Sequence, residues 1–216
     1  MPRKYKIVVL PGDGVGAEVV PEAVKVLKAV EESTTGLALE FHEFECGAHY
    51  WLKTGKREEW PSEAFQACKH STAVLFGAVG LPDAVKPDGT MVGGDVVFGM
   101  RSGLDLYANV RPVKLYQGVE CPIVGKKHDD IDFVIVRENT EDLYSQIRGA
   151  LTRGEETELA VDVRVVTRKG AERVIKYAFE LCRRRKGAPL DDKHRVTCVD
   201  KSNVLRGCVF FRRVYE

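Results

Sequence analysis

Three arginines stand where a binding site for a small diacid could form. Arg101 follows the segment FGM, Arg111 precedes a proline, and Arg137 follows the apolar run FVIV. Planar guanidinium groups bind carboxylates through paired hydrogen bonds. Each arginine could instead form a surface ion pair, as Arg101 and Asp105 would at i,i+4 spacing on a helix. Taken alone, each arginine is better explained by a surface ion pair than by a binding site. A binding site therefore requires that all three arginines converge.

Two other residues could move protons. Tyr144 closes the segment RENTEDLY, which is dense in functional groups, and Lys201 lies just beyond the apolar run VTCV. A lysine with an ordinary pKa near 10.4 must fall to about 7–8 to act as a base, which requires about 3–5 kcal/mol from its surroundings. A half-buried core phenol and a surface cation are the simpler interpretations. The three arginines tip the balance towards catalysis.

A glycine-rich turn could hold a phosphate. The sequence GDGVGA at 12–17 fits a loose G-x-G-x-x-A dinucleotide fingerprint, with Glu31, Glu32 and Glu40 as possible ribose partners. Alternatively the glycines only permit a tight turn, and Asp13 caps the helix that follows. The pattern alone leaves both interpretations open.

Apolar patterning predicts the elements that must position these residues. Strands are expected at 6–10, 37–44 and 73–77, with a helix after the first strand lined by Val20, Val24, Leu27 and Val30, and a long loop at 80–95. A second region begins near residue 107. It contains strand-like sequence up to 115, strands at 133–136 and 161–166, a helix at 171–185, a buried strand at 196–199 and a helical pattern at 209–216. Alternating strands and helices predict an α/β fold with a parallel sheet.

Composition excludes several classes of protein. The 216 residues carry 33 Lys and Arg against 32 Asp and Glu, a net charge of +1, which disfavours nucleic-acid binding. No apolar run approaches the ~20 residues of a membrane span, and no signal peptide is evident. Six cysteines without a C-x-x-C pair indicate reduced thiols. We therefore expect a cytoplasmic protein of one or two domains, with no nucleic-acid or membrane partner.

Taken together, five motifs resemble the β-decarboxylating dehydrogenases that act on isocitrate, isopropylmalate, homoisocitrate and tartrate. They are KIVVLPGDGVGAEVV, LFGAVG, LDLYANVRPVKLY, VIVRENTEDLYS and VDKSNVL, in the family's order. The resemblance implies a two-domain α/β fold that is not a Rossmann domain. Residues 1–106 would form the N-terminal part of an incomplete large domain, and 107–216 a partial small domain that dimerises.

The resemblance also implies roles for seven residues and for two cofactors. The arginines matching Arg101, Arg111 and Arg137 bind carboxylates of a malate-type 2-hydroxy acid, Tyr144 is a general acid, Lys201 deprotonates the hydroxyl, and Asn203 and Gly80 contact NAD or NADP. A Mg²⁺ or Mn²⁺ ion polarises the keto oxygen before decarboxylation. The family's lysine serves the neighbouring subunit of a homodimer.

The sequence departs from the family in one respect. The D-x-x-x-D metal ligands and the adenosine loop would follow the VDKSNV motif in a stretch that is not present, so no metal ligand is assigned and a non-catalytic regulatory subunit or inactive fragment is the alternative. The family reads its substrate with residues before the first arginine, here 94–98. An inward Asp95 would repel a third carboxylate, which favours a tartrate- or malate-like acid over isocitrate.

Overall fold

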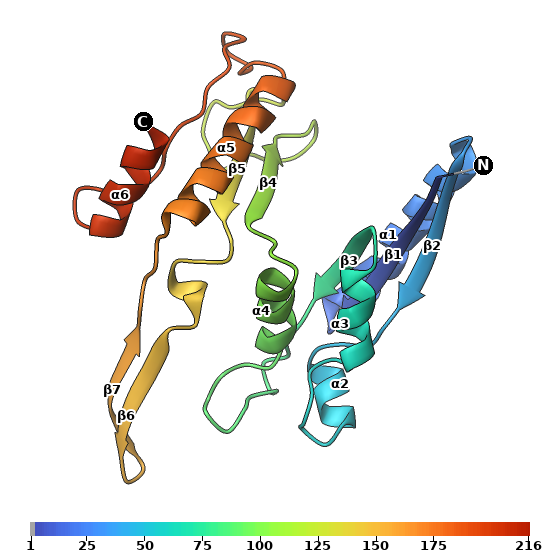
Figure 1. Cartoon of the computed structure of the whole chain (residues 1–216). Coiled ribbons are helices and arrows are strands. Elements are labelled where there is room, and N and C mark those ends of the chain that lie inside the picture. Colours follow the sequence, from blue (N-terminus) through green and yellow to red (C-terminus); the bar gives the residue numbers. More distant parts are fainter. Residues whose placement is uncertain (1–2) are drawn as a thin grey trace. The chain divides into compact units, whose positions relative to one another are not determined.

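The computed structural model describes residues 3–216, which form two compact units. The first ends at Leu104 and the second comprises Asp105–Glu216. The elements of each unit are shown in Figure 1. None of the helices in the described part is long and apolar enough to cross a membrane.

The first unit is built on a parallel sheet of order β2-β1-β3. Its strands are β1 (Arg3–Gly12), β2 (Leu37–Glu43) and β3 (Ala73–Ala78), which confirms the three expected strands. The central strand holds Val8, Val9 and Leu10, each at most 2% exposed. A continuous apolar run is typical of a strand that is covered on both faces.

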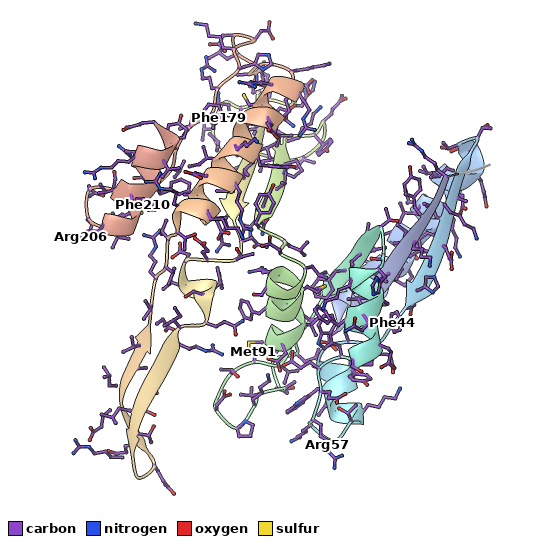
Figure 2. The ribbon with its side chains drawn as sticks, in the orientation of Figure 1. Phe44, Arg57, Met91, Phe179, Arg206 and Phe210 are labelled. Atoms are coloured by element: carbon purple, nitrogen blue, oxygen red, sulfur yellow. The ribbon has the colours of Figure 1, made fainter. Side chains whose placement is uncertain are left out.

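Helices cover both faces of this sheet, with α1 (Val15–Ser33) behind it and α3 (Ser62–Lys69) in front of it in Figure 1. The expected apolar face of α1 is buried near the start of the helix, at Val20, but is exposed near its end, at Val30. Two further helices are α2 (Ala48–Lys53), which follows β2 after a short connection, and α4 (Gly94–Gly103), which follows β3 after a long one. The main core joins Val8 and Leu10 of β1 to side chains of α3 and α4. Phe44, labelled in Figure 2, packs against this core. The other buried members of the core are Cys46, Ala64, Cys68, Val96 and Met100.

The second unit contains two antiparallel strand pairs and two helices. Strands β4 (Ala108–Lys114) and β5 (Asp132–Glu138) form one pair, and β6 (Arg148–Arg153) and β7 (Glu156–Asp162) form a hairpin. The helix α5 (Arg168–Arg184) packs on β5, and α6 (Arg206–Tyr215) packs on α5. A short 3₁₀ turn, η1 (Leu143–Ser145), lies between β5 and β6.

Two strand predictions in this unit are wrong. The expected strand at 161–166 ends at Asp162, and the hairpin to which it belongs begins much earlier. Residues 196–199 are not a strand, and Val199 is 88% exposed. An apolar run becomes a strand only where a neighbouring strand satisfies its backbone groups, and among the described residues no strand pairs with this segment. The helices expected at 171–185 and 209–216 are confirmed as α5 and α6.

Candidate functional site

The strands β4 and β5 bring Arg111 and Arg137 to one face of their ladder. Asn109 lies opposite Arg137, and Arg111 lies opposite Ile135. Because side chains alternate along a strand, the two arginines are diagonal neighbours on the same face. Arg111 Nε donates a hydrogen bond to Asn109 Oδ1 at 3.0 Å. Two of the three predicted carboxylate-binding residues are therefore neighbours on one rigid element.

Tyr144 lies directly beside this pair. The guanidinium carbon of Arg137 is 4.9 Å from the centre of the Tyr144 ring, and both residues are half-buried. A cation over an aromatic face is attracted by the ring quadrupole. The second unit thus brings together three of the predicted site residues, with a planar cation and a phenol in contact.

The turn that carries Tyr144 is fixed by an ion pair between Asp142 and Arg164, which the sequence does not predict. Asp142 has a positive φ of 64° and exchanges backbone hydrogen bonds with Val165. Its carboxylate accepts from Arg164 Nε at 2.6 Å and Arg164 Nη2 at 3.3 Å. The Asp142 and Cys208 hydrogen bonds raise the pKa of Arg164 above its usual value. Arg164 Nη1 also donates to Cys208 Sγ on α6 at 3.2 Å.

Lys201 and Asn203 lie in an exposed turn that precedes α6. The Lys201 carbonyl accepts hydrogen bonds from Val204 and Leu205, which closes the turn. Both the Lys201 and Asn203 side chains are exposed. Asp200, immediately before the lysine, has a side chain only 3% exposed and an ion pair with Arg212. The turn is therefore anchored at its start and open at its tip.

Arg101 belongs to the first unit, on the last turns of α4, where it lies 5.7 Å from the centre of the Phe98 ring. Arg101 and Asp105 do not share a helix, because α4 ends at Gly103, and Asp105 accepts from Arg173 Nη1 at 2.7 Å and 2.9 Å. The start of α4 is capped by Glu59, which is 2% exposed. Its Oε2 accepts from the amides of Gly93, Asp95 and Val96 at 2.9, 2.8 and 3.4 Å.

Asp95, the residue expected to repel a third carboxylate, shares a lysine with Glu59. Lys86 Nζ lies 2.8 Å from Asp95 Oδ2 and 2.8 Å from Glu59 Oε1. Partial burial favours the neutral amine, but hydrogen bonds to Asp95 and Glu59 outweigh it and raise the pKa of Lys86. Because one lysine faces two carboxylates, the ion pair weakens the electrostatic argument against isocitrate but leaves a net negative charge in place.

Asp13 caps a helix, but not the one expected. The start of α1 has no side-chain cap, whereas the Asp13 carboxylate accepts from the amides of Ala48 and His49 at the start of α2, at 2.6 and 2.9 Å. It also accepts from the amide of Gly80 at 2.7 Å. Gly12 packs so closely on β3 that a side chain there would collide with the Ala78 carbonyl. The glycine turn therefore has a packing role that requires no phosphate.

Gly80 has a similar structural requirement. Its φ is 100°, and a β-carbon there would approach the Val92 carbonyl oxygen to 2.9 Å. Its amide is already bonded to Asp13. Two of the three possible ribose partners are also engaged within the first unit, since Glu31 accepts from the Leu39 amide at 2.7 Å and Glu40 accepts from His42 at 2.8 Å. Of the two candidate cofactor residues, Asn203 has an exposed side chain, whereas Gly80 is held by contacts within the first unit.

Within residues 3–216 no group of three or more His, Cys, Asp and Glu side chains could hold a metal ion. The residues present therefore do not fit a complete Mg²⁺ or Mn²⁺ site, which needs several oxygen ligands. All six cysteines are free thiols.

The α/β fold places Arg111, Arg137 and Tyr144 close together in the second unit. The family model described as isocitrate/isopropylmalate dehydrogenase matches residues 6–216, and the chain belongs to this family. It is 40% identical over 202 residues to the tartrate dehydrogenase/decarboxylase of Pseudomonas putida, covering 93% of this chain and 52% of that protein. It is also 40% identical to the decarboxylating D-malate dehydrogenase of Escherichia coli K12, covering 95% and 54% of the two chains.

A solved structure agrees with this assignment. The crystal structure of isocitrate dehydrogenase from Methylococcus capsulatus matches with a TM-score of 0.78 and 32% identity, covering 98% of this chain and 56% of that one. The chain has the isocitrate dehydrogenase-like α/β fold expected from its motifs, and it spans about half the length of the relatives that it matches.

Proposed function

We propose that the protein oxidises a malate-type 2-hydroxy acid with NAD or NADP and decarboxylates the product. The observation that carries this proposal is the contact of Arg137 with Tyr144 beside Arg111, because it places a carboxylate-binding group next to a proton donor. The family membership and the tartrate and D-malate names of two relatives support the same reaction class. Among these substrates we favour a tartrate- or malate-like acid.

In the proposed reaction, this chain's own residues bind the substrate and move its protons. Arg111 and Arg137, with Arg101, bind its carboxylates. Lys201 accepts the hydroxyl proton, and in a homodimer it does so at the neighbouring subunit's site. Tyr144 returns a proton to the enol carbon after CO₂ is lost.

The two cofactors would supply what these side chains cannot. Bound NAD or NADP would supply the hydride acceptor, and a bound divalent ion would supply polarisation of the keto oxygen. We propose Asn203 and Gly80 as nicotinamide-cofactor contacts, Asn203 through its exposed side-chain amide. Because the described residues offer no complete metal site, no step is assigned to the ion through them.

We also propose a homodimer formed through the second unit. Both strands of the β6–β7 hairpin are exposed along their whole length, and the paired Leu151 and Leu159 are 49% and 54% exposed. Exposed apolar side chains on a projecting hairpin are typical of an interface. Light scattering should give twice the mass of one chain, and Leu151→Asp should shift the measured mass to that of the monomer.

We also propose a cytoplasmic location, which the free thiols support.

The direct test is a coenzyme-reduction screen. The protein, expressed from its natural reading frame with any residues that follow Glu216, is given NAD⁺ or NADP⁺, Mg²⁺ or Mn²⁺, and isocitrate, isopropylmalate, malate or tartrate in turn. An increase in the absorbance of reduced coenzyme together with release of CO₂ would support the proposal. Binding of a hydroxy acid without reduction of either coenzyme would contradict it and support the regulatory-subunit alternative.

A further inference from the structure

The carboxylate of Asp200 is held by a two-point ion pair from α6. Arg212 Nε lies 2.8 Å from Oδ2, and Arg212 Nη2 lies 3.0 Å from Oδ1. Oδ1 also accepts from the Ser202 amide at 2.7 Å, and the Cys198 thiol donates to Oδ2 at 3.4 Å. The Arg212 guanidinium, helped by the Ser202 amide, holds the pKa of Asp200 well below its usual range. Two parallel hydrogen bonds fix the direction of a carboxylate as well as its distance.

The helix that carries Arg212 is itself fixed on α5. The rings of Phe179 and Tyr215 stack with centres 5.7 Å apart, and Arg168 lies 5.3 Å from the centre of the Phe210 ring. Figure 2 labels both phenylalanines, Phe179 on α5 and Phe210 on α6. The Tyr215 hydroxyl also donates to the Val196 carbonyl at 2.6 Å. Arg212 therefore reaches the turn from a rigid support.

We propose that Arg212 is a positioning residue for Lys201, acting through Asp200. The inference rests on the role proposed above for Lys201. Asp200 and Lys201 share a peptide bond, so a carboxylate held at two points limits how the next residue can turn. An ion pair with a purely structural role could lie next to any residue, whereas this ion pair lies next to Lys201, the residue proposed to accept a proton from the substrate.

The same geometry recurs at the other proton-transfer residue. Asp142, two residues before Tyr144, is held at two points by Arg164, which also contacts Cys208 on α6. Both turns are thus connected to a single helix through an arginine and an aspartate. This second case supports positioning as the purpose of the pairs.

The pair also has an electrostatic consequence. Without Arg212, the carboxylate of Asp200 would carry an uncompensated negative charge one residue before Lys201, and a nearby negative charge favours the ammonium form of a lysine. The other groups near this pair are the Cys198 thiol and the carboxylate of Glu216. Neither supplies a positive charge. Arg212 is therefore required both to hold the turn and to cancel the charge of Asp200.

The test uses three variants of the protein from its natural reading frame: Arg212→Met, Asp200→Asn and the double variant. For Arg212→Met we expect kcat/KM to fall about tenfold or more from misplacement, and the acid limb of its pH profile to move to higher pH by about half a unit. Asp200→Asn should move the limb to lower pH. The double variant should return the limb to its original position while the rate stays low.

Arg213→Met is the matched control, because Arg213 is the next residue of α6, is exposed and forms no ion pair within residues 3–216. It should leave both rate and limb unchanged. Arg212→Lys keeps the charge and should retain the limb position. An unshifted limb in Arg212→Met, or equal shifts in Arg212→Met and Arg213→Met, would overturn the proposal.

A readout that needs no turnover separates this inference from the proposed function. Acetylation of Lys201 by limiting acetic anhydride, followed across pH by peptide mass spectrometry, should show the same order of shifts. If the parent protein oxidises none of the hydroxy acids but the acetylation profiles shift as expected, the proposed function fails and the coupling of Arg212 to Lys201 stands. Identical profiles in all variants would contradict the coupling whatever the activity.

Discussion

The guanidinium of Arg137 lies over the ring of Tyr144, 4.9 Å from its centre. The two residues come from the end of β5 and from the turn η1, seven positions apart. An arginine stacked in this way keeps the edge of its planar fork available for a carboxylate. The contact therefore fixes the phenol relative to whatever anion Arg137 binds.

Tyr144→Phe separates proton donation from packing. The ring remains beneath Arg137, so substrate binding should change by less than about threefold, whereas loss of the hydroxyl should lower formation of the decarboxylated product by about 10²–10⁴-fold. Release of CO₂ and coenzyme reduction are measured separately. Undiminished decarboxylation in this variant would remove Tyr144 from the mechanism.

Arg111→Met and Arg137→Met test the carboxylate-binding face. Each should raise KM on the order of tenfold to a hundredfold, because a charge-assisted hydrogen bond contributes about 1.5–3 kcal/mol. Arg183→Met, at an exposed position of α5, serves as a control and should leave KM unchanged. A KM effect as large in Arg183→Met would indicate general electrostatics instead of a site.

Glu59→Ala should destabilise the first unit. The change removes the acceptor of three amides at the start of α4 and leaves Lys86 without one of its two partners. Loss of a buried cap should cost about 1–3 kcal/mol, read from the urea midpoint of unfolding. Glu58→Ala, at the neighbouring exposed position, is the comparison. Equal stability of the two variants would show that the α4 cap contributes nothing.

Thiol alkylation should distinguish the cysteines by burial. Burial, with the nearby Asp13 carboxylate, raises the pKa of Cys46 to about 12, and burial with a bond to Asp200 raises the pKa of Cys198 to about 11. Since only the thiolate reacts, both should resist N-ethylmaleimide at pH 8 and react faster as the pH rises towards those values. Mass spectrometry of the alkylated peptides compares the labelling rate of each cysteine in the native and the unfolded protein. Rapid labelling of Cys46 in the native protein would contradict the prediction.

Short-range patterns predicted most of the elements because their causes are local. The run KIVVL is a covered central strand, and the periodic apolar face of 171–185 is the helix α5. The hairpin β6–β7 was missed, although Gly154 and Glu155 form a two-residue connection between Arg153 and Glu156. A glycine in such a short connection between alternating segments is a hairpin signal.

The residues that hold the candidate site could not be predicted in the same way. Asp13 was expected to cap the helix next to it, yet it caps α2 across a long connection, and Glu59 caps α4 from far along the chain. Arg164 and Arg212 carry no local mark that pairs them with Asp142 and Asp200. Such partners depend on tertiary approach, which the spacing of residues along a chain does not encode.

The carboxylate of Asp13 also constrains the order in which the first unit assembles. Its partners Ala48 and Gly80 lie 35 and 67 positions along the chain, so both contacts require long loops to close first. Contacts of such high sequence separation form late in a nucleated process. The contact with Gly80 closes the longer loop, so it should form after the contact with Ala48, and the turn that follows β3 should be the last of these segments to gain protection from hydrogen exchange.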